Sequence, residues 1–311
     1  MWADEFEGTE LDLTKWSYDI GQGSSGWGNN ELQFYTNSLS NVKVDTGYLH
    51  ISAKEEAFGA ADYTSGKIKT KDLYEFKYGK IESRIKVPVD QGMWPAFWML
   101  GSNIDVVSWP QCGEIDIFEH VNNETVIHGT HHYNNNGWTY QGGSVTCDAS
   151  EFQVYSIEWS PDNIKWFLNG VQYYQANIGP SSTSKEEFHE TFYLILNLAV
   201  GGNWPGSPDG TTEFPGIMLV DYVRVYQNED NLSVPETKVN DLVVYPNPAQ
   251  ESLTIEGIET IASYSVFNML GQEILVGDTE TLNVSMLNAG MYYIKAELLD
   301  GTLVSTPLEI Q

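Results

Sequence analysis

Three carboxylates lie close together in one short segment, WPQCGEIDIFEH at residues 109–120. Glu114, Asp116 and Glu119 are interleaved with apolar residues, as in a buried strand. In a regular strand, residues 114 and 116 share one face, whereas residue 119 points to the other. A β-bulge at Ile117–Phe118 would absorb one residue and return Glu119 to the first face. The spacing therefore predicts three acids that point into one cleft while their apolar neighbours pack inside a sheet.

Carboxylates held side by side repel one another, so at least one should hold a proton at neutral pH. One ionised and one protonated carboxyl group about 5 Å apart are what retaining glycoside hydrolysis requires. The spacing alone also fits an exposed strand face or a cation site. Cation sites use flexible loops with mixed oxygen ligands, which differs from acids alternating with hydrophobic residues on a strand.

The elements that must position these acids are predicted to be β-strands. Turn signals such as Asn169-Gly separate short runs rich in β-branched and aromatic residues, and only 185–192 is a short helix candidate. The clearest runs in the first part are 49–53, 79–87, 114–119, 155–159, 164–168 and 218–226. So many strands predict an all-β, two-sheet sandwich whose curved inner face could hold a polymer in a concave cleft.

Aromatic content divides the 311 residues in two. All 10 tryptophans lie at or before Trp204, and residues 229–311 contain only 5 of the aromatic residues, with 13 acidic and 2 basic side chains. The polar, Pro-containing stretch 229–240 is predicted to be a linker between domains at 1–228 and 241–311. Runs at 242–245, 253–255, 264–267, 282–284 and 291–296 predict a small second β-sandwich.

The formal net charge of −28 limits the partners. Such a surface repels nucleic acid and sulfated or uronic polymers, so a neutral substrate is expected. No apolar run approaches the ~20 residues that a membrane-spanning helix needs. Cys112 and Cys147 could form one disulfide or remain free thiols. No signal peptide is visible after Met1, so we expect either an intracellular protein or one whose leader is absent.

Residues 2–227 resemble glycoside hydrolase family 16, and within it the bacterial laminarinase-like endo-β-1,3-glucanases. The motifs that carry this resemblance are 4–6, 26–33 (GWGNNELQ), 64–66, 78–86, 93–101 (MWPAFWMLG), 113–119 (GEIDIFE), 129–133 (GTHHY), 194–206 and 220–226. The resemblance implies a β-jelly roll with the acids on its concave face. It implies Glu114 as nucleophile, Asp116 as the neighbour that orients it, and Glu119 as general acid and then base. No cofactor is implied for catalysis.

The resemblance also implies residues that bind substrate. Trp94, Trp98 and Trp109 match cleft positions of the family, Trp204 is a candidate at the groove edge, and Asn29, Arg84, His132 and Asn197 match polar positions near the acids. Flat indoles suit the apolar faces of neutral sugar rings. Trp16, Trp159 and Trp166 are instead expected in the core. Lys67 stands where the family has arginine, which keeps the charge but loses the forked geometry.

Many family members carry a structural calcium ion far from the acids. Glu7, Asp221 and the carbonyl of Gly47 match its ligand positions, so a structural Ca²⁺ is an expectation for this chain. Asp221 could equally be a surface acid on a strand.

The second domain resembles the C-terminal sorting domain of type IX secretion in Bacteroidetes. The motifs are 243–249 (VVYPNPA), 253–255, 268–272, 282–287 and 289–295. This resemblance implies export by the type IX machinery, to the medium or the cell surface, and a leader that has been removed. We expect the protein to be a monomer. The last segment, 305–311, lacks the basic residues common at such ends. A carbohydrate-binding module is disfavoured because the domain has no tryptophan.

The sequence thus predicts a secreted endo-β-1,3-glucanase with a retaining mechanism. A mixed-linkage β-1,3-1,4-glucanase is the closest alternative, and enzymes acting on anionic galactans are disfavoured by charge. A glucan-recognition or adhesive protein without activity is also disfavoured, because all three acids are present.

Overall fold

The computed structural model describes residues 1–179, 185–227, 242–256, 261–269, 271–299 and 303–311. The chain divides into two compact units, Met1–Asn231 and Leu232–Gln311. The predicted linker at 229–240 lies outside the described residues. Within the described residues, no helix has the length and apolar character needed to cross a membrane.

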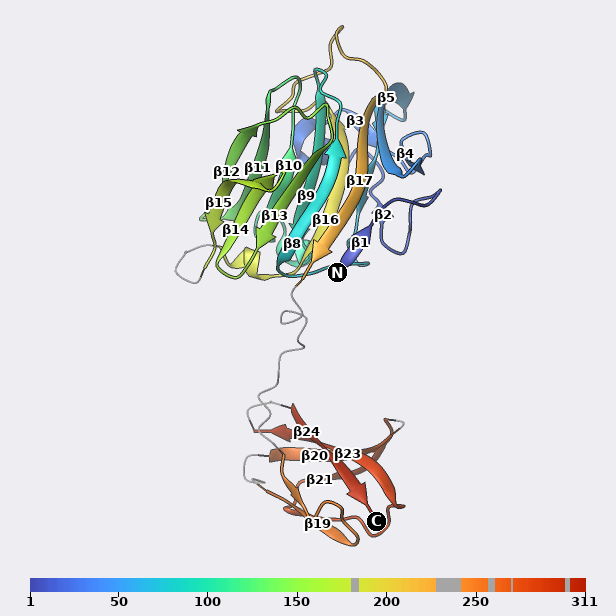
Figure 1. Ribbon diagram of the computed structural model, residues 1–311, viewed down its shortest axis with the longest axis vertical. Coiled ribbons are helices and arrows are strands. Elements are labelled where there is room, and N and C mark those ends of the chain that lie inside the picture. The colour runs from blue at the N-terminus through green and yellow to red at the C-terminus, as the bar shows by residue number, and fades with distance from the viewer. Residues whose placement is uncertain (180–184, 228–241, 257–260, 270, 300–302) are drawn as a thin grey trace. The chain divides into compact units, whose positions relative to one another are not determined.

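The first unit is built from two large sheets (Figure 1). The ten-stranded sheet has the order β15 (Val171–Asn177), β14 (Asn163–Leu168), β13 (Gln153–Trp159), β8 (Gly79–Lys86), β17 (Gly216–Tyr226), β5 (Tyr48–Phe58), β6 (Ala61–Ser65) and β3 (Gln33–Tyr35), with β1 (Trp2–Asp4) beside β17 and β4 (Val42–Asp45) beside β5. The seven-stranded sheet has the order β12 (Trp138–Thr146), β11 (Val126–Asn134), β10 (Glu114–Glu119), β9 (Met93–Gly101), β16 (Phe192–Val200), β7 (Lys67–Lys69) and β2 (Ser17–Tyr18). Among the described strands of this unit, all pairings are antiparallel except that of β3 with β6.

In the part of the chain that the structure describes, helical structure is confined to three short segments. They are a π-helical segment, η1 (Gly26–Asn30), the α-helix α1 (Ile104–Val107) and the 3-10 helix η2 (Glu186–His189). The helix candidate at 185–192 is thus a single 3-10 turn followed by a strand. The all-β fold class is confirmed.

One core fills the space between the two sheets, because alternate residues of each strand point inward. Trp16, Trp159 and Trp166 are buried in it, as predicted, with at most 2% of their surface exposed. Cys112 and Cys147 are both buried free thiols, so the disulfide alternative is wrong.

The second unit has its own core between two smaller sheets, which confirms the predicted small β-sandwich. One sheet has the order β18 (Val244–Tyr245), β19 (Ser252–Ile255) and β22 (Thr281–Asn283), and the other has β21 (Glu273–Gly277), β20 (Ile261–Asn268), β23 (Gly290–Leu298) and β24 (Leu303–Ile310).

The predicted bulge in β10 is confirmed by the pairing of its neighbours. Asp116 lies opposite Trp98 of β9 while Phe118 lies opposite Phe97, so two steps along β10 match one step along β9. The register with β11 shifts at the same place. Ile117 and Phe118 both enter the core, and the acids are left on the opposite face.

The ten-stranded sheet supports this bulge through Trp166 of β14. Its indole Nε1–H donates to the backbone carbonyl oxygen of Asp116 at 2.8 Å. Gly129 of β11 makes room for the indole, since a Cβ atom there would lie 2.4 Å from Trp166 Cδ1. The carbonyl beside the bulge is therefore satisfied from the other sheet.

We expect Trp166→Phe to lower the free energy of unfolding by about 2–4 kcal/mol, because it leaves a small cavity and an unsatisfied buried carbonyl. Urea denaturation followed by circular dichroism measures this. Trp204→Phe, at a position 41% exposed, is the matched control and should change stability by less than about 0.5 kcal/mol. Equal stability of Trp166→Phe and wild type would contradict a supporting role for this bond.

Candidate active site

The three acids of β10 lie together on the face of the seven-stranded sheet that points away from the core. Asp116 is buried, and Glu114 and Glu119 are partly buried. Each glutamate accepts a hydrogen bond at 3.0 Å from an indole: Glu114 Oε2 from Trp109, and Glu119 Oε1 from Trp94. Two tryptophans predicted to bind substrate therefore also hold the carboxylates in place.

His132 of β11 reaches the same cluster from the neighbouring strand, directly opposite Glu114. Its Nε2 lies 3.1 Å from Asp116 Oδ2 and 3.5 Å from Glu114 Oε1. One polar side-chain atom from each of Glu114, Asp116 and His132 lies within 4.8 Å of the others. His132 thus lies beside the acids, as predicted, and contacts two of them.

Burial and mutual repulsion set the protonation of the two glutamates. Burial, followed by the charge of Asp116, raises the pKa of Glu114 to about 7, although His132, Trp109 and Lys67 oppose the rise. The same two causes raise the pKa of Glu119 well above its ordinary value. Glu119 is therefore the group that keeps its proton, and Glu114 is the one that ionises more readily.

Aromatic rings stand on both sides of the acids along the strand direction. Beside Glu119, the Trp94 and Trp204 rings meet edge to face with centroids 5.6 Å apart. Beside Glu114, the rings of Trp109 and Trp138 lie 5.5 Å apart, and Trp138 stacks on Tyr140 at 5.7 Å. These rings offer flat apolar surfaces next to polar groups, which is what binding a sugar ring requires.

A hydrogen-bonded chain joins the remaining polar positions. Trp98 Nε1–H donates to Asn197 Oδ1 at 2.7 Å, and Asn197 Nδ2–H donates to the Tyr35 hydroxyl at 3.1 Å. Tyr35 in turn donates to Glu31 Oε2, whose other oxygen accepts from Asn29. Asn29, Trp98 and Asn197 thus belong to one network across β9, β16 and the η1 segment.

Lys67 is the departure from the family pattern, and the structure buries it in this region. Its ammonium lies 4.2 Å from the centroid of Trp27 and 5.2 Å from that of Trp98, with Asp19 at 3.6 Å. Burial lowers the pKa of Lys67, while Asp19 and Glu31 raise it. The compact Lys67 ammonium therefore makes cation–π contacts with both indoles.

Arg84 does not lie with the acids, and its predicted role in substrate binding is corrected. It belongs to β8 of the ten-stranded sheet, where Ile81, Ser83 and Ile85 point inward and Arg84 points to the opposite face. Its guanidinium pairs with Asp221 at 2.7 Å and lies 4.3 Å from the centroid of Phe152.

The same ion pair bears on the predicted calcium ligands. Asp221 lies on β17, and its carboxylate already has a cationic partner in Arg84. Calcium binding by Glu7, Gly47 and Asp221 stays a prediction.

Sequence reasoning missed Trp138 and Tyr140, the exposed aromatic residues of β12. Their alternate spacing, directly after the turn Asn135-Asn-Gly, was the available signal. Only the pairing of β12 with β11 shows that both lie beside His132.

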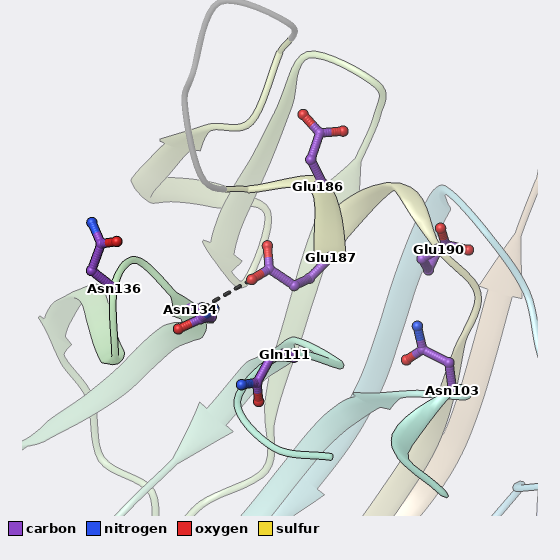
Figure 2. A pocket seen from close by; sticks show the side chains of 7 residues that line it. All are labelled: Asn103, Gln111, Asn134, Asn136, Glu186, Glu187 and Glu190. Carbon is purple, nitrogen blue, oxygen red and sulfur yellow. Dashed lines mark hydrogen bonds between the residues drawn. The ribbon is translucent and has the colours of Figure 1, made fainter. Parts of the chain in front are cut away.

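A separate polar pocket of about 440 Å³ lies beyond the ends of these strands (Figure 2). Its lining residues are Asn103, Gln111, Asn134, Asn136, Glu186, Glu187 and Glu190. Burial raises the pKa of Glu187, whose Oε1 accepts from the backbone N–H of Asn134. None of these residues belongs to the acid cluster.

The raised pKa of Glu114 has a consequence for stability. Because the folded protein holds this proton more tightly than a chain with the ordinary pKa of 4.5, stability is fully present below that pH and is lost as pH rises through about 7. Glu114→Gln keeps the neutral form at every pH. We expect its free energy of unfolding to exceed that of wild type by about 1–3 kcal/mol at pH 8 and to match it at pH 4.

Urea denaturation at both pH values measures this difference. The matched control is Glu158→Gln, which removes the same charge at an exposed position of β13 and should give no pH-dependent gain. A Glu114→Gln variant that is no more stable than wild type at pH 8 would contradict the raised pKa of Glu114.

Comparison with known proteins agrees with this geometry. Residues 27–224 match the glycosyl hydrolases family 16, and residues 243–306 match a secretion system C-terminal sorting domain. The chain is 41% identical to a β-glucanase of Rhodothermus marinus, over 73% of this chain and 84% of that protein. It is 40% identical to the clotting factor G alpha subunit of Tachypleus tridentatus, over 75% of this chain but only 34% of that longer protein.

Among solved structures, the laminarinase catalytic domain of Thermotoga maritima matches with a TM-score of 0.66 and 40% identity, over 73% of this chain and 97% of that domain. The family match covers the strands that carry the acids, the indoles and His132. The chain therefore belongs to glycosyl hydrolase family 16.

Proposed function

We propose that the first domain is an endo-acting β-1,3-glucanase that retains the anomeric configuration. The observation that carries the proposal is the bulged strand β10, which places Glu114, Asp116 and Glu119 on one face with separated proton affinities. Similarity to a β-glucanase and a laminarinase supports the substrate class. A mixed-linkage β-1,3-1,4-glucan is the alternative substrate, and a glucan-binding protein without activity is the alternative function.

The chemistry would proceed by double displacement. Glu119 donates its proton to the glycosidic oxygen while the Glu114 carboxylate attacks the anomeric carbon, and the glycosyl ester forms as the leaving sugar departs. Glu119, now ionised, takes a proton from water, and the resulting hydroxide displaces Glu114 with a second inversion. Both carboxyl groups then regain their starting protonation.

The surroundings support each role. Trp109 and Trp94 donate hydrogen bonds that orient the two glutamates, and each opposes but does not cancel the rise in the pKa of its partner. Asp116 raises the pKa of both glutamates, so it favours a proton on Glu119. As Glu119 loses its proton to the leaving group and Glu114 becomes a neutral ester, the total charge of the cluster stays constant.

We further infer that the second domain directs type IX export and that the enzyme acts outside the cell or on its surface. The match of residues 243–306 to a sorting domain supports this. The boundaries 1–228 for the catalytic domain and 241–311 for the sorting domain are part of the same proposal.

Removal of either glutamate should abolish hydrolysis of a soluble linear β-1,3-glucan. We expect Glu114→Gln and Glu119→Gln to lower kcat/KM by several orders of magnitude, since each variant loses one of two obligatory groups. Release of reducing sugar measures this, with Glu158→Gln as the charge-matched control. Substantial activity in Glu114→Gln would contradict the nucleophile assignment.

The roles of the two glutamates can be separated with an aryl β-glucoside oligomer, whose leaving group needs no proton, in the presence of azide. Glu119→Ala should still form the glycosyl-enzyme and yield the β-glycosyl azide. Glu114→Ala, which leaves room for azide in place of the carboxylate, should yield only the α-azide by direct displacement. Cleavage of mixed-linkage glucan but not β-1,3-glucan by wild type would change the substrate and keep the mechanism. Binding without cleavage of any glucan would indicate a recognition protein.

A further inference from the structure

Trp138 makes a contact that none of the assigned roles uses. It is the first residue of β12, and 58% of its surface is exposed. Its indole Nε1–H donates to Nδ1 of His132 at 3.0 Å. The two rings are nearly parallel, with an interplanar angle of 10° and centroids 6.0 Å apart. An exposed indole is thus directed at the one ring nitrogen of His132 that faces away from the acids.

This hydrogen bond restricts the protonation of His132. A nitrogen that accepts from an indole N–H has an unshared electron pair and carries no proton. The proton of a neutral His132 must then reside on Nε2, which lies 3.1 Å from Asp116 Oδ2 and 3.5 Å from Glu114 Oε1. The contact therefore selects the tautomer that donates to the acid cluster.

The acids around His132 favour its doubly protonated form, whereas the hydrogen bond from Trp138 opposes it. Burial alone would lower its pKa, but the hydrogen bond to Asp116 and the charges of Asp116, Glu114 and Glu119 raise it to about 9. Tyr140, the other β12 side chain beside it, stacks on His132 with ring centroids 5.7 Å apart and has no ring N–H to donate. The adjacent His131 is fully buried and contacts the rings of Tyr133 and Trp166 instead. Among the described side chains facing His132, Trp138 alone places an N–H where a second proton would have to sit.

We propose that Trp138 is a positioning residue: its indole N–H fixes His132 as the Nε2–H tautomer and opposes protonation of Nδ1. A cationic His132 would favour the ionised forms of Glu114 and Glu119, since its charge lowers the proton affinity of both. By restraining that charge, Trp138 helps Glu119 to keep the proton that it must donate. This kinetic consequence rests on the proposed function, whereas the tautomer does not.

The protonation of His132 can be measured directly in the full chain. Ring ¹⁵N chemical shifts of the six histidines, with His132→Gln used to assign the signal, report both tautomer and pKa. We expect the neutral ring of His132 in wild type, observed above its pKa, to be the Nε2–H tautomer. In Trp138→Phe, which keeps an aromatic ring but removes the N–H, we expect a pKa higher by about one unit. Tyr140→Phe, on the same face of β12, is the matched control and should titrate as wild type does.

The kinetic experiment measures kcat/KM on linear β-1,3-glucan as a function of pH. The decrease at high pH, the alkaline limb, reports loss of the proton from the general acid. We expect Trp138→Phe to move this limb to lower pH by about half a unit to one unit, whatever it does to KM. In Tyr140→Phe the limb should stay in place.

Identical His132 titration in wild type and Trp138→Phe, or the Nδ1–H tautomer in wild type, would overturn the proposal. An altered titration with an unmoved alkaline limb would overturn the link to Glu119. If wild type cleaves no glucan, the proposed function fails, and the ¹⁵N measurement still decides the tautomer.

Discussion

Repulsion among three carboxylates on one half-buried strand is the constraint on which the rest of the site depends. Burial and like charge together raise the pKa of Glu114 and Glu119. Such a cluster destabilises the folded state when it is ionised. Hydrogen bonds and packing from the neighbouring strands compensate for this cost. The same strain keeps a proton available on a carboxylic acid at neutral pH, which acid catalysis needs.

The groups that hold the acids come from both sheets and from several strands. Indoles from β9 and from the loop before β10 donate to Glu119 and Glu114, and His132 contacts Asp116 from β11. Trp166 satisfies the carbonyl beside the bulge from the opposite sheet. Rigid strands and fixed indoles hold the carboxylates without supplying positive charge, so their raised proton affinities are kept.

Two described side chains, Lys67 and His132, bring positive charge to the acid cluster. Lys67 is buried between aromatic rings and opposes the rise in the pKa of Glu114. Arg84, by contrast, pairs with Asp221 on the ten-stranded sheet. A further cation beside the acids, in addition to Lys67 and a protonated His132, would favour ionised Glu119 and weaken it as an acid. The arrangement of charges therefore matches an acid–base pair better than a cation or anion site.

The strands, the bulge and the common face of the three acids could be predicted from the sequence alone, because each depends on residues that are close together in the chain. The period of two in β10, broken once, predicted both the bulge and the common face of Glu114, Asp116 and Glu119, since strand alternation depends only on neighbouring residues. The fall in aromatic content after residue 228 predicted two domains, because composition can be read from the sequence without any knowledge of packing.

Contacts between strands distant in sequence were decided only by the tertiary structure. Alternation predicts that Arg84 points away from the core, but both sheets have such a face, and sheet membership is a property of pairing. The same holds for Trp138, which meets His132 only through the register of β12 with β11. Cys112 and Cys147 likewise remain free because of where their strands and loops lie. Local alternation says which way a side chain points, whereas only the packed sheets determine what it meets.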